Sequence, residues 1–232
     1  MEEIKTPVLL PTTVVPSRKP RRKGFSMPII TKEQLKDIIL LSNAPPKFKA
    51  LAAFIYLTGA RVSEIVPNKL RKWRGITLGQ LINGTDLIVE SVGDKTFWVL
   101  QNIPVEKIRD RNPFTKRKNI KGIKFRNIPI NLESSFDFTE IVTNWIESEF
   151  DEVNRKPTPN TVLFPYTRQW VQYNLNHFMG IFPHYLRHLR LTHLVQDYGI
   201  SDAHLQLITG WDSTTTAMHY RHLNWRDVAK LI

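Results

Sequence analysis

The chain contains no cysteine, which excludes a disulfide framework, a thiolate zinc site and a cysteine nucleophile. It also lacks any run of about 20 uninterrupted apolar residues, the length that a membrane-spanning helix needs. The N-terminus does not have the charged and then apolar order of a secretory signal. Neither a membrane partner nor secretion is therefore expected.

Acidic residues are scarce relative to basic ones, with 21 Asp and Glu against 33 Lys and Arg, and the formal net charge is +12. This balance is typical of proteins that bind polyanions, although ribosomal and simply soluble proteins can share it. The 232 residues, 41% of them hydrophobic, are enough to bury one sizeable core. We expect one main domain and consider nucleic acid a candidate partner.

Residues 1–25 are expected to form a flexible basic arm, because residues 18–23 are a compact basic run in a Pro-rich, apolar-poor segment that cannot form a core. The same composition would also suit a solubilising tail or a nuclear-address signal. The candidate DNA-contacting residues of the arm are Arg18, Lys19, Arg21, Arg22 and Lys23.

Helix-capping residues followed by apolar residues at helical spacing predict a mostly helical chain. The predicted N-terminal caps are Thr31, Asp137, Thr167 and Ser201, and a further helix is expected to begin at Pro183. The glycines predicted to end helices in the left-handed conformation are Gly59, Gly199 and Gly210.

Three segments rich in Val, Ile, Phe and Trp predict strands, at residues 86–90, 96–103 and 124–130. Turn residues Gly93 and Asp94 separate the first two segments. The expected fold class is therefore α+β, mostly α-helical, with a small antiparallel β-sheet.

A candidate anion site is expected at His184 and Arg187, which are three residues apart and so share one face of their predicted helix. Arg187 offers a fixed fork of donors, and His184 can donate a hydrogen bond or exchange a proton near neutral pH. A phosphodiester under attack gathers charge on both non-bridging oxygens, so a second cation is needed, and Arg61 is the candidate. Tyr220 would then be the nucleophile.

These residues lie in three segments that follow one another in a characteristic order: TGARVSEI at 58–65, HYLRH at 184–188, and GW at 210–211 with Tyr220 nine residues later. Together they resemble the tyrosine recombinase (phage integrase) family over roughly residues 31–232. The resemblance implies the family's catalytic domain, the DNA breaking-rejoining fold, at residues 26–232 without a separate core-binding domain. It also implies a site-specific recombinase or integrase that cleaves and rejoins DNA through a 3′-phosphotyrosyl intermediate.

Two further positions carry the resemblance. Residues 121–130, KGIKFRNIPI, are similar to the family's KGxKxRxVPL hairpin, which implies that Lys121 is the general acid. The basic residues just before it, Lys116, Arg117 and Lys118, are candidate DNA contacts, and the two lysines among them remain alternatives for the acid. Trp211 stands where many members have histidine and Cre-like members have tryptophan, and an indole N–H can donate to a phosphate oxygen but cannot carry a proton.

The resemblance therefore implies double-stranded DNA as partner, self-assembly into a synaptic multimer on DNA, and no metal or other cofactor. The expected location is the cytoplasm, or the nucleus of a eukaryotic host. The implied catalytic residues are Arg61, Lys121, His184, Arg187, Trp211 and Tyr220.

Three alternatives stay open. A helix-turn-helix around Gly199 would fit a non-catalytic DNA-binding protein, including a degenerate recombinase. A type IB topoisomerase would share the chemistry and differ in the fate of the nick. A metal at His184 and His188 is disfavoured, because there is no HExxH arrangement and Arg187 lies between the two histidines.

Overall fold

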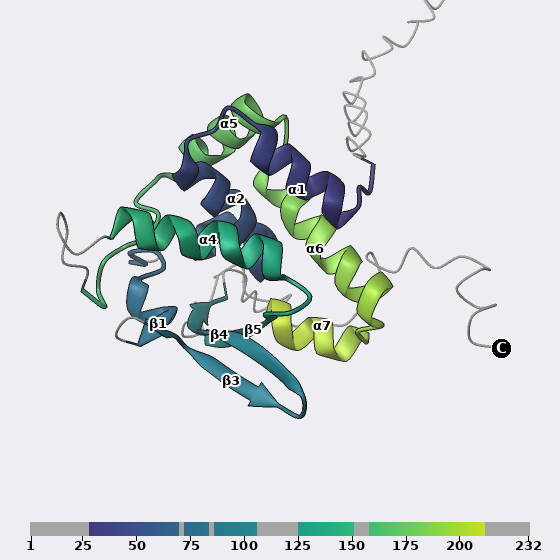
Figure 1. Cartoon of the computed structure of the whole chain (residues 1–232). Helices are drawn as coiled ribbons and strands as arrows, with labels where there is room; N and C mark the ends of the chain where they lie inside the picture. Colours follow the sequence, from purple (N-terminus) through teal and green to yellow (C-terminus); the bar gives the residue numbers. More distant parts are fainter. Residues whose placement is uncertain (1–27, 70–71, 84–85, 106–124, 151–157, 212–232) are drawn as a thin grey trace, which may run out of the picture.

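The computed structural model describes residues 28–69, 72–83, 86–105, 125–150 and 158–211 (Figure 1). The expected arm, the basic residues 116–118, Lys121 and Tyr220 lie outside these ranges. None of the helices within them is long and apolar enough to cross a membrane.

Most of the described chain is helical. The main helices are α1 (Lys32–Leu41), α2 (Pro46–Thr58), α3 (Val62–Ile65), α4 (Phe136–Glu149), α5 (Arg168–Met179), α6 (Pro183–Tyr198) and α7 (Asp202–Thr209). The caps predicted at Thr31, Thr167 and Ser201 are confirmed, because each side chain accepts a hydrogen bond from the backbone N–H three residues later. The three predicted C-terminal glycines also have left-handed backbone angles.

The capping box predicted at Asp137 is wrong. Helix α4 begins at Phe136, and Ser135 is in the N-cap position without a side-chain capping bond. Asp137 lies instead in the first turn, where a carboxylate also interacts favourably with the helix dipole. The apolar stripe predicted for this helix is largely confirmed, and its buried members are Phe138, Val142, Trp145 and Ile146.

The main sheet contains the strands β3 (Val89–Val92), β4 (Lys95–Pro104) and β5 (Phe125–Asn131) in the antiparallel order β3-β4-β5. The strand predicted at 86–90 is divided, because β2 (Asp86–Leu87) pairs with β1 (Ile82–Asn83) in a separate ribbon. The chain changes partner at Ile88, whose N–H donates to the Leu81 carbonyl and whose own carbonyl accepts from the Val99 N–H.

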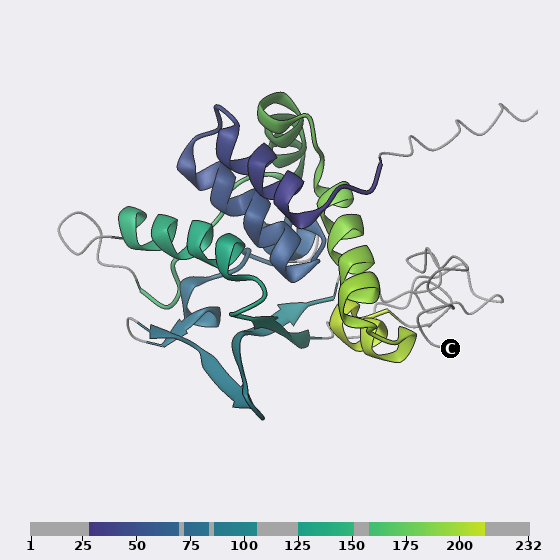
Figure 2. The same ribbon diagram turned by 45° about the vertical axis from the view of Figure 1, so that its right-hand side comes forward.

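Helix α2 is the centre of the core. All its residues from Ala50 to Thr58 are buried, and it packs against α4 and α6. The helices α1, α2, α4 and α5 lie on one side of the three-stranded sheet, and α7 lies beside β5 (Figures 1 and 2). The end of α2 therefore faces both the sheet and α6, so that residues following α2 can meet side chains from both.

The start of α1 is tied to α6. The Tyr185 hydroxyl donates to the Pro28 carbonyl at 2.7 Å, and Lys32 forms an ion pair with Asp197 at 2.7 Å. A third contact joins His193 Nε2 to the Ile30 carbonyl at 2.9 Å. These contacts fix the point at which the chain emerges from residues 1–27.

Candidate functional site

The turn after α2 holds Arg61. Gly59 ends α2 with a φ of +55°, and the chain reverses so that Arg61 becomes the N-cap residue of α3. The carboxylate of Glu64 accepts from the Arg61 backbone N–H at 2.9 Å and from its Nη1 at 3.1 Å. Arg61 is thus held at both its backbone and its guanidinium, while its side chain stays 18% exposed.

Glu64 also binds an arginine from the sheet. Arg126 Nη2 donates to Glu64 Oε2 at 2.8 Å, and the Arg126 and Glu64 side chains are 6% and 1% exposed. Burial acts to raise the pKa of Glu64, but the positive charges of Arg126, Arg187 and Arg61 outweigh burial and hold that pKa below its usual range. The carboxylate is therefore ionised and joins α3 to β5.

Arg187 approaches the same place from α6. It is 2% exposed, and its Nη1 donates a short hydrogen bond to the carbonyl of Gly59, two residues before Arg61. Around Glu64 the guanidiniums of Arg61, Arg126 and Arg187 thus come together. We call Arg61, Glu64, Arg126 and Arg187 the Glu64 cluster. Its guanidinium forks have the geometry that binds an anion such as a phosphate.

Trp211 lies beside this cluster. The Arg187 guanidinium is 5.6 Å from the centroid of the Trp211 ring, which is close enough for a cation–π contact. Trp211 is 9% exposed and belongs to a small apolar cluster with Leu191, Leu194 and Leu205. The indole is therefore held in place by packing.

Gly210 brings the end of α7 against the end of β4. Its φ is +69°, and an added Cβ would lie 2.5 Å from the Val105 side chain, so only glycine fits. Val105 is the last described residue before the segment that contains Lys121, and Trp211 is the last before the segment that contains Tyr220. Val105 and Gly210 therefore lie against each other.

Among the predicted catalytic residues, the structure describes Arg61, His184, Arg187 and Trp211. It brings the two arginines and the tryptophan together. His184 lies on the first turn of α6, one turn before Arg187, and it is exposed whereas Arg187 is buried. Lys121, Tyr220 and the predicted DNA contacts of residues 18–23 and 116–118 lie outside the described residues.

Sequence reasoning missed Glu64 and Arg126. Glu64 could have been found as an acid three residues after Arg61, because an N3 glutamate reaches back to the N-cap N–H. Arg126 lies in the recognised hairpin segment, but its contact with a residue 62 positions away could not be read from local spacing. Within the described ranges, no three His, Asp or Glu side chains gather as metal ligands.

Comparison with known proteins shows similarity only at the level of structure. No model of a known protein family matches the sequence, and no curated protein matches it either. The XerA recombinase crystal structure is 17% identical with a TM-score of 0.53, over 92% of this chain and 65% of that one. The Tn1549 transposon integrase (residues 82–397) in complex with circular intermediate DNA is 18% identical with a TM-score of 0.51, over 90% of this chain and 67% of that one.

The chain thus spans about two thirds of the length of both solved chains. The expected fold class is confirmed, since helices and small antiparallel sheets combine here as in these neighbours. The described residues have the fold of the tyrosine recombinase catalytic domain.

Proposed function

We propose that the chain is the catalytic domain of a site-specific tyrosine recombinase or integrase, at residues 26–232. The observation that carries this proposal is the Glu64 cluster, in which three arginines from α3, β5 and α6 converge on one carboxylate. Guanidinium forks brought together from three separate elements match the oxygens of a phosphodiester, whose charge grows as it is attacked.

Arg61 and Arg187 would bind the two non-bridging oxygens of the scissile phosphate. Their fixed forks match phosphate geometry, and they provide the charge neutralisation that a metal ion provides in other enzymes. His184 and Trp211 would donate further hydrogen bonds, with the indole taking the place that histidine has in many relatives, as in Cre-like members. Arg126 would hold the cluster together through Glu64.

Tyr220 would attack the phosphorus in line and form a 3′-phosphotyrosyl bond, releasing a 5′-hydroxyl. Ionising an ordinary phenol fully at neutral pH costs about 4 kcal/mol, so proton removal during attack, to His184, would lower the barrier. Lys121 would protonate the departing 5′-oxygen. The phosphotyrosine conserves the energy of the broken bond, so the strand can be rejoined without ATP.

Double-stranded DNA is the proposed partner. The net charge of +12 supports it, and so does the circular intermediate DNA in the complex of the similar Tn1549 integrase. The basic residues 18–23 and 116–118 would contact phosphates, and several protomers would assemble on DNA for strand exchange.

Covalent trapping tests the proposal. A library of nicked duplexes with randomised flanks lets the 5′-hydroxyl leave on a short fragment, so any phosphotyrosine adduct persists and can be sequenced. The unaltered chain should form the adduct, and Tyr220→Phe should bind DNA within a few-fold yet form none. Tyr173→Phe, at an exposed tyrosine on α5, is the matched control and should keep the adduct.

Two results would count against the proposal. An adduct formed by Tyr220→Phe would mean that another residue is the nucleophile. DNA binding without an adduct for the unaltered chain would favour a non-catalytic DNA-binding protein.

A further inference from the structure

A second buried arginine on α6 has a very different environment. Arg190 is 5% exposed, and its guanidinium is 5.6 Å from the centroid of the Tyr56 ring. The Tyr56 hydroxyl is 2.8 Å from His193 Nδ1, and His193 Nε2 is 2.9 Å from the Ile30 carbonyl. With the Nε2 proton on His193, the hydroxyl donates to Nδ1 and Nε2 donates to the carbonyl. Arg190 thus lies beside the neutral pair formed by Tyr56 and His193. We call Arg190, Tyr56 and His193 the Arg190 relay.

Arg190 has no carboxylate partner within the described residues, and its Nε has no hydrogen-bond acceptor there. An arginine side chain cannot lose its proton in a protein. A buried charge without a counter-ion is unfavourable, so such a group is normally paired or binds a ligand. The guanidinium is therefore available to pair with an anionic ligand.

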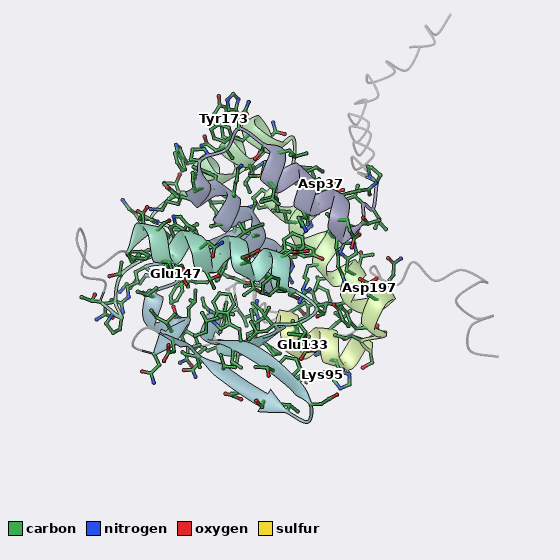
Figure 3. All side chains as sticks on the ribbon, viewed as in Figure 1. Asp37, Lys95, Glu133, Glu147, Tyr173 and Asp197 are labelled. Carbon is green, nitrogen blue, oxygen red and sulfur yellow. The ribbon has the colours of Figure 1, made fainter. Side chains whose placement is uncertain are left out.

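Arg190 borders a cavity of about 330 Å³ between β4, β5 and the C-terminal end of α6. The apolar walls include Leu57, Phe97, Ile128, Leu194, Ile200 and Ile208. Lys95 and Glu133 also line the cavity, and both are exposed at the side of the molecule where the sheet meets α6 and α7 (Figure 3). The charges of Lys95 and Glu133 are opposite and balance each other. Because Arg190 adds a buried positive charge, the cavity is expected to favour an anionic ligand.

We propose that this cavity binds a small carboxylic acid with an apolar body. The guanidinium fork would pair with the carboxylate, and the aliphatic walls would enclose the rest of the ligand. A phosphate dianion fits less well, because one buried cation would leave half of its charge unmatched. A nucleic acid strand fits less well still, since its sugars and phosphates would lie against aliphatic walls. This site is independent of the proposed DNA chemistry.

Octanoate and 1-octanol form a matched pair of probes, because they share the apolar chain and differ in the charged head. Isothermal titration of the full chain without DNA should show octanoate binding at least tenfold more tightly than 1-octanol, since only the carboxylate can form a charge-assisted hydrogen bond with Arg190. Arg190→Met should remove this preference, so that both probes bind equally within about threefold. Lys95→Gln, at the exposed rim, should retain it.

A second variant keeps the test decisive if Arg190→Met does not fold. Ile208→Trp leaves Arg190 intact but fills the cavity, and it should abolish binding of both probes. Equal affinity for the two probes, unchanged octanoate binding in Arg190→Met, or no octanoate binding at millimolar concentration would each overturn the proposal. Self-association that depends on Arg190 and resists octanoate would also overturn it, since a second copy would then be the occupant.

Discussion

Helix α6 carries two buried arginines one turn apart, each beside an aromatic ring, but the other groups around them differ. Arg187 belongs to the Glu64 cluster, where an ionised carboxylate holds Arg61 and Arg126 by direct ion pairs. Arg190 faces Tyr56 and an apolar cavity, with no carboxylate partner among the described residues. Two arginines of one helix thus differ: Arg187 belongs to a cluster that contains a carboxylate, whereas Arg190 has no carboxylate partner among the described residues.

This difference separates two uses of a buried guanidinium. In the Glu64 cluster the carboxylate orients the arginines before any ligand arrives, which suits binding of a transition state. In the Arg190 relay the neighbours are neutral, so the whole charge remains to be matched. The two regions should therefore respond in opposite ways when charge is removed.

The largest effect is expected at the carboxylate. Glu64→Gln removes the carboxylate that pairs with Arg61 and with the buried Arg126, so the free energy of unfolding should fall by about 3 kcal/mol or more. Urea denaturation monitored by tryptophan fluorescence measures this change. Glu147→Gln, at an exposed glutamate of α4, is the control and should change stability by less than about 0.5 kcal/mol. A loss below about 1 kcal/mol for Glu64→Gln would mean that the carboxylate does not hold the cluster.

The same substitution at two arginines compares the regions directly. Arg126→Met breaks an ion pair and leaves Glu64 short of a partner, so it should destabilise the protein by about 3 kcal/mol. Arg190→Met removes a charge that has no counter-ion among the described residues, so its stability should stay within about 1 kcal/mol of the unaltered chain or rise. If both variants lose a similar amount of unfolding free energy in the same denaturation assay, the distinction between the Glu64 cluster and the Arg190 relay is contradicted.

The helix boundaries were predictable because their causes are local. Thr31, Thr167 and Ser201 each cap a helix with their own side chain, and Gly59, Gly199 and Gly210 adopt angles that other residues avoid. The errors arose where two local solutions fit equally well. An acidic residue suits both a cap and a first turn, which misled the prediction at Asp137, and the strand at 86–90 divides because Ile88 bonds to two different partners.

The candidate site was predictable only in part. Arg61, Arg187 and Trp211 lie in recognisable segments, and the structure brings them together. Glu64 was missed because its importance depends on Arg126 and Arg187, which are distant in the sequence. Arg190 gave no signal, since an arginine in an amphipathic helix is ordinarily a surface residue.

The pH dependence of the unfolding free energy should also distinguish the two regions, with a smaller effect. Burial, the largest influence, lowers the pKa of His193 in the Arg190 relay below its ordinary value of 6.5. The unfolded chain then binds the proton more tightly, so this stability is present above pH 6.5 and is lost as the pH falls below it. His193→Asn should reduce the change in unfolding free energy between about pH 7.5 and 5.5.

The Glu64 cluster should respond only in more acidic solution. Because the pKa of Glu64 lies below its ordinary value of 4.5, its contribution to stability is present above that pH and is lost as the pH falls through the folded-state pKa. The outcome that would contradict the His193 prediction lies between about pH 7.5 and 5.5. If the unfolding free energies of His193→Asn and of the unaltered chain change equally over this range, the Arg190 relay does not titrate there.

The central claim is that the Glu64 cluster neutralises a scissile phosphate, and substrate charge tests it most directly. Arg187→Ala should cleave an ordinary phosphodiester on the order of a hundredfold more slowly than the unaltered chain. On a methylphosphonate, which lacks one non-bridging charge, the same variant should be slower by less than about tenfold, because less charge remains to be matched. An equal loss on both substrates would contradict the account and make Arg187 a structural residue.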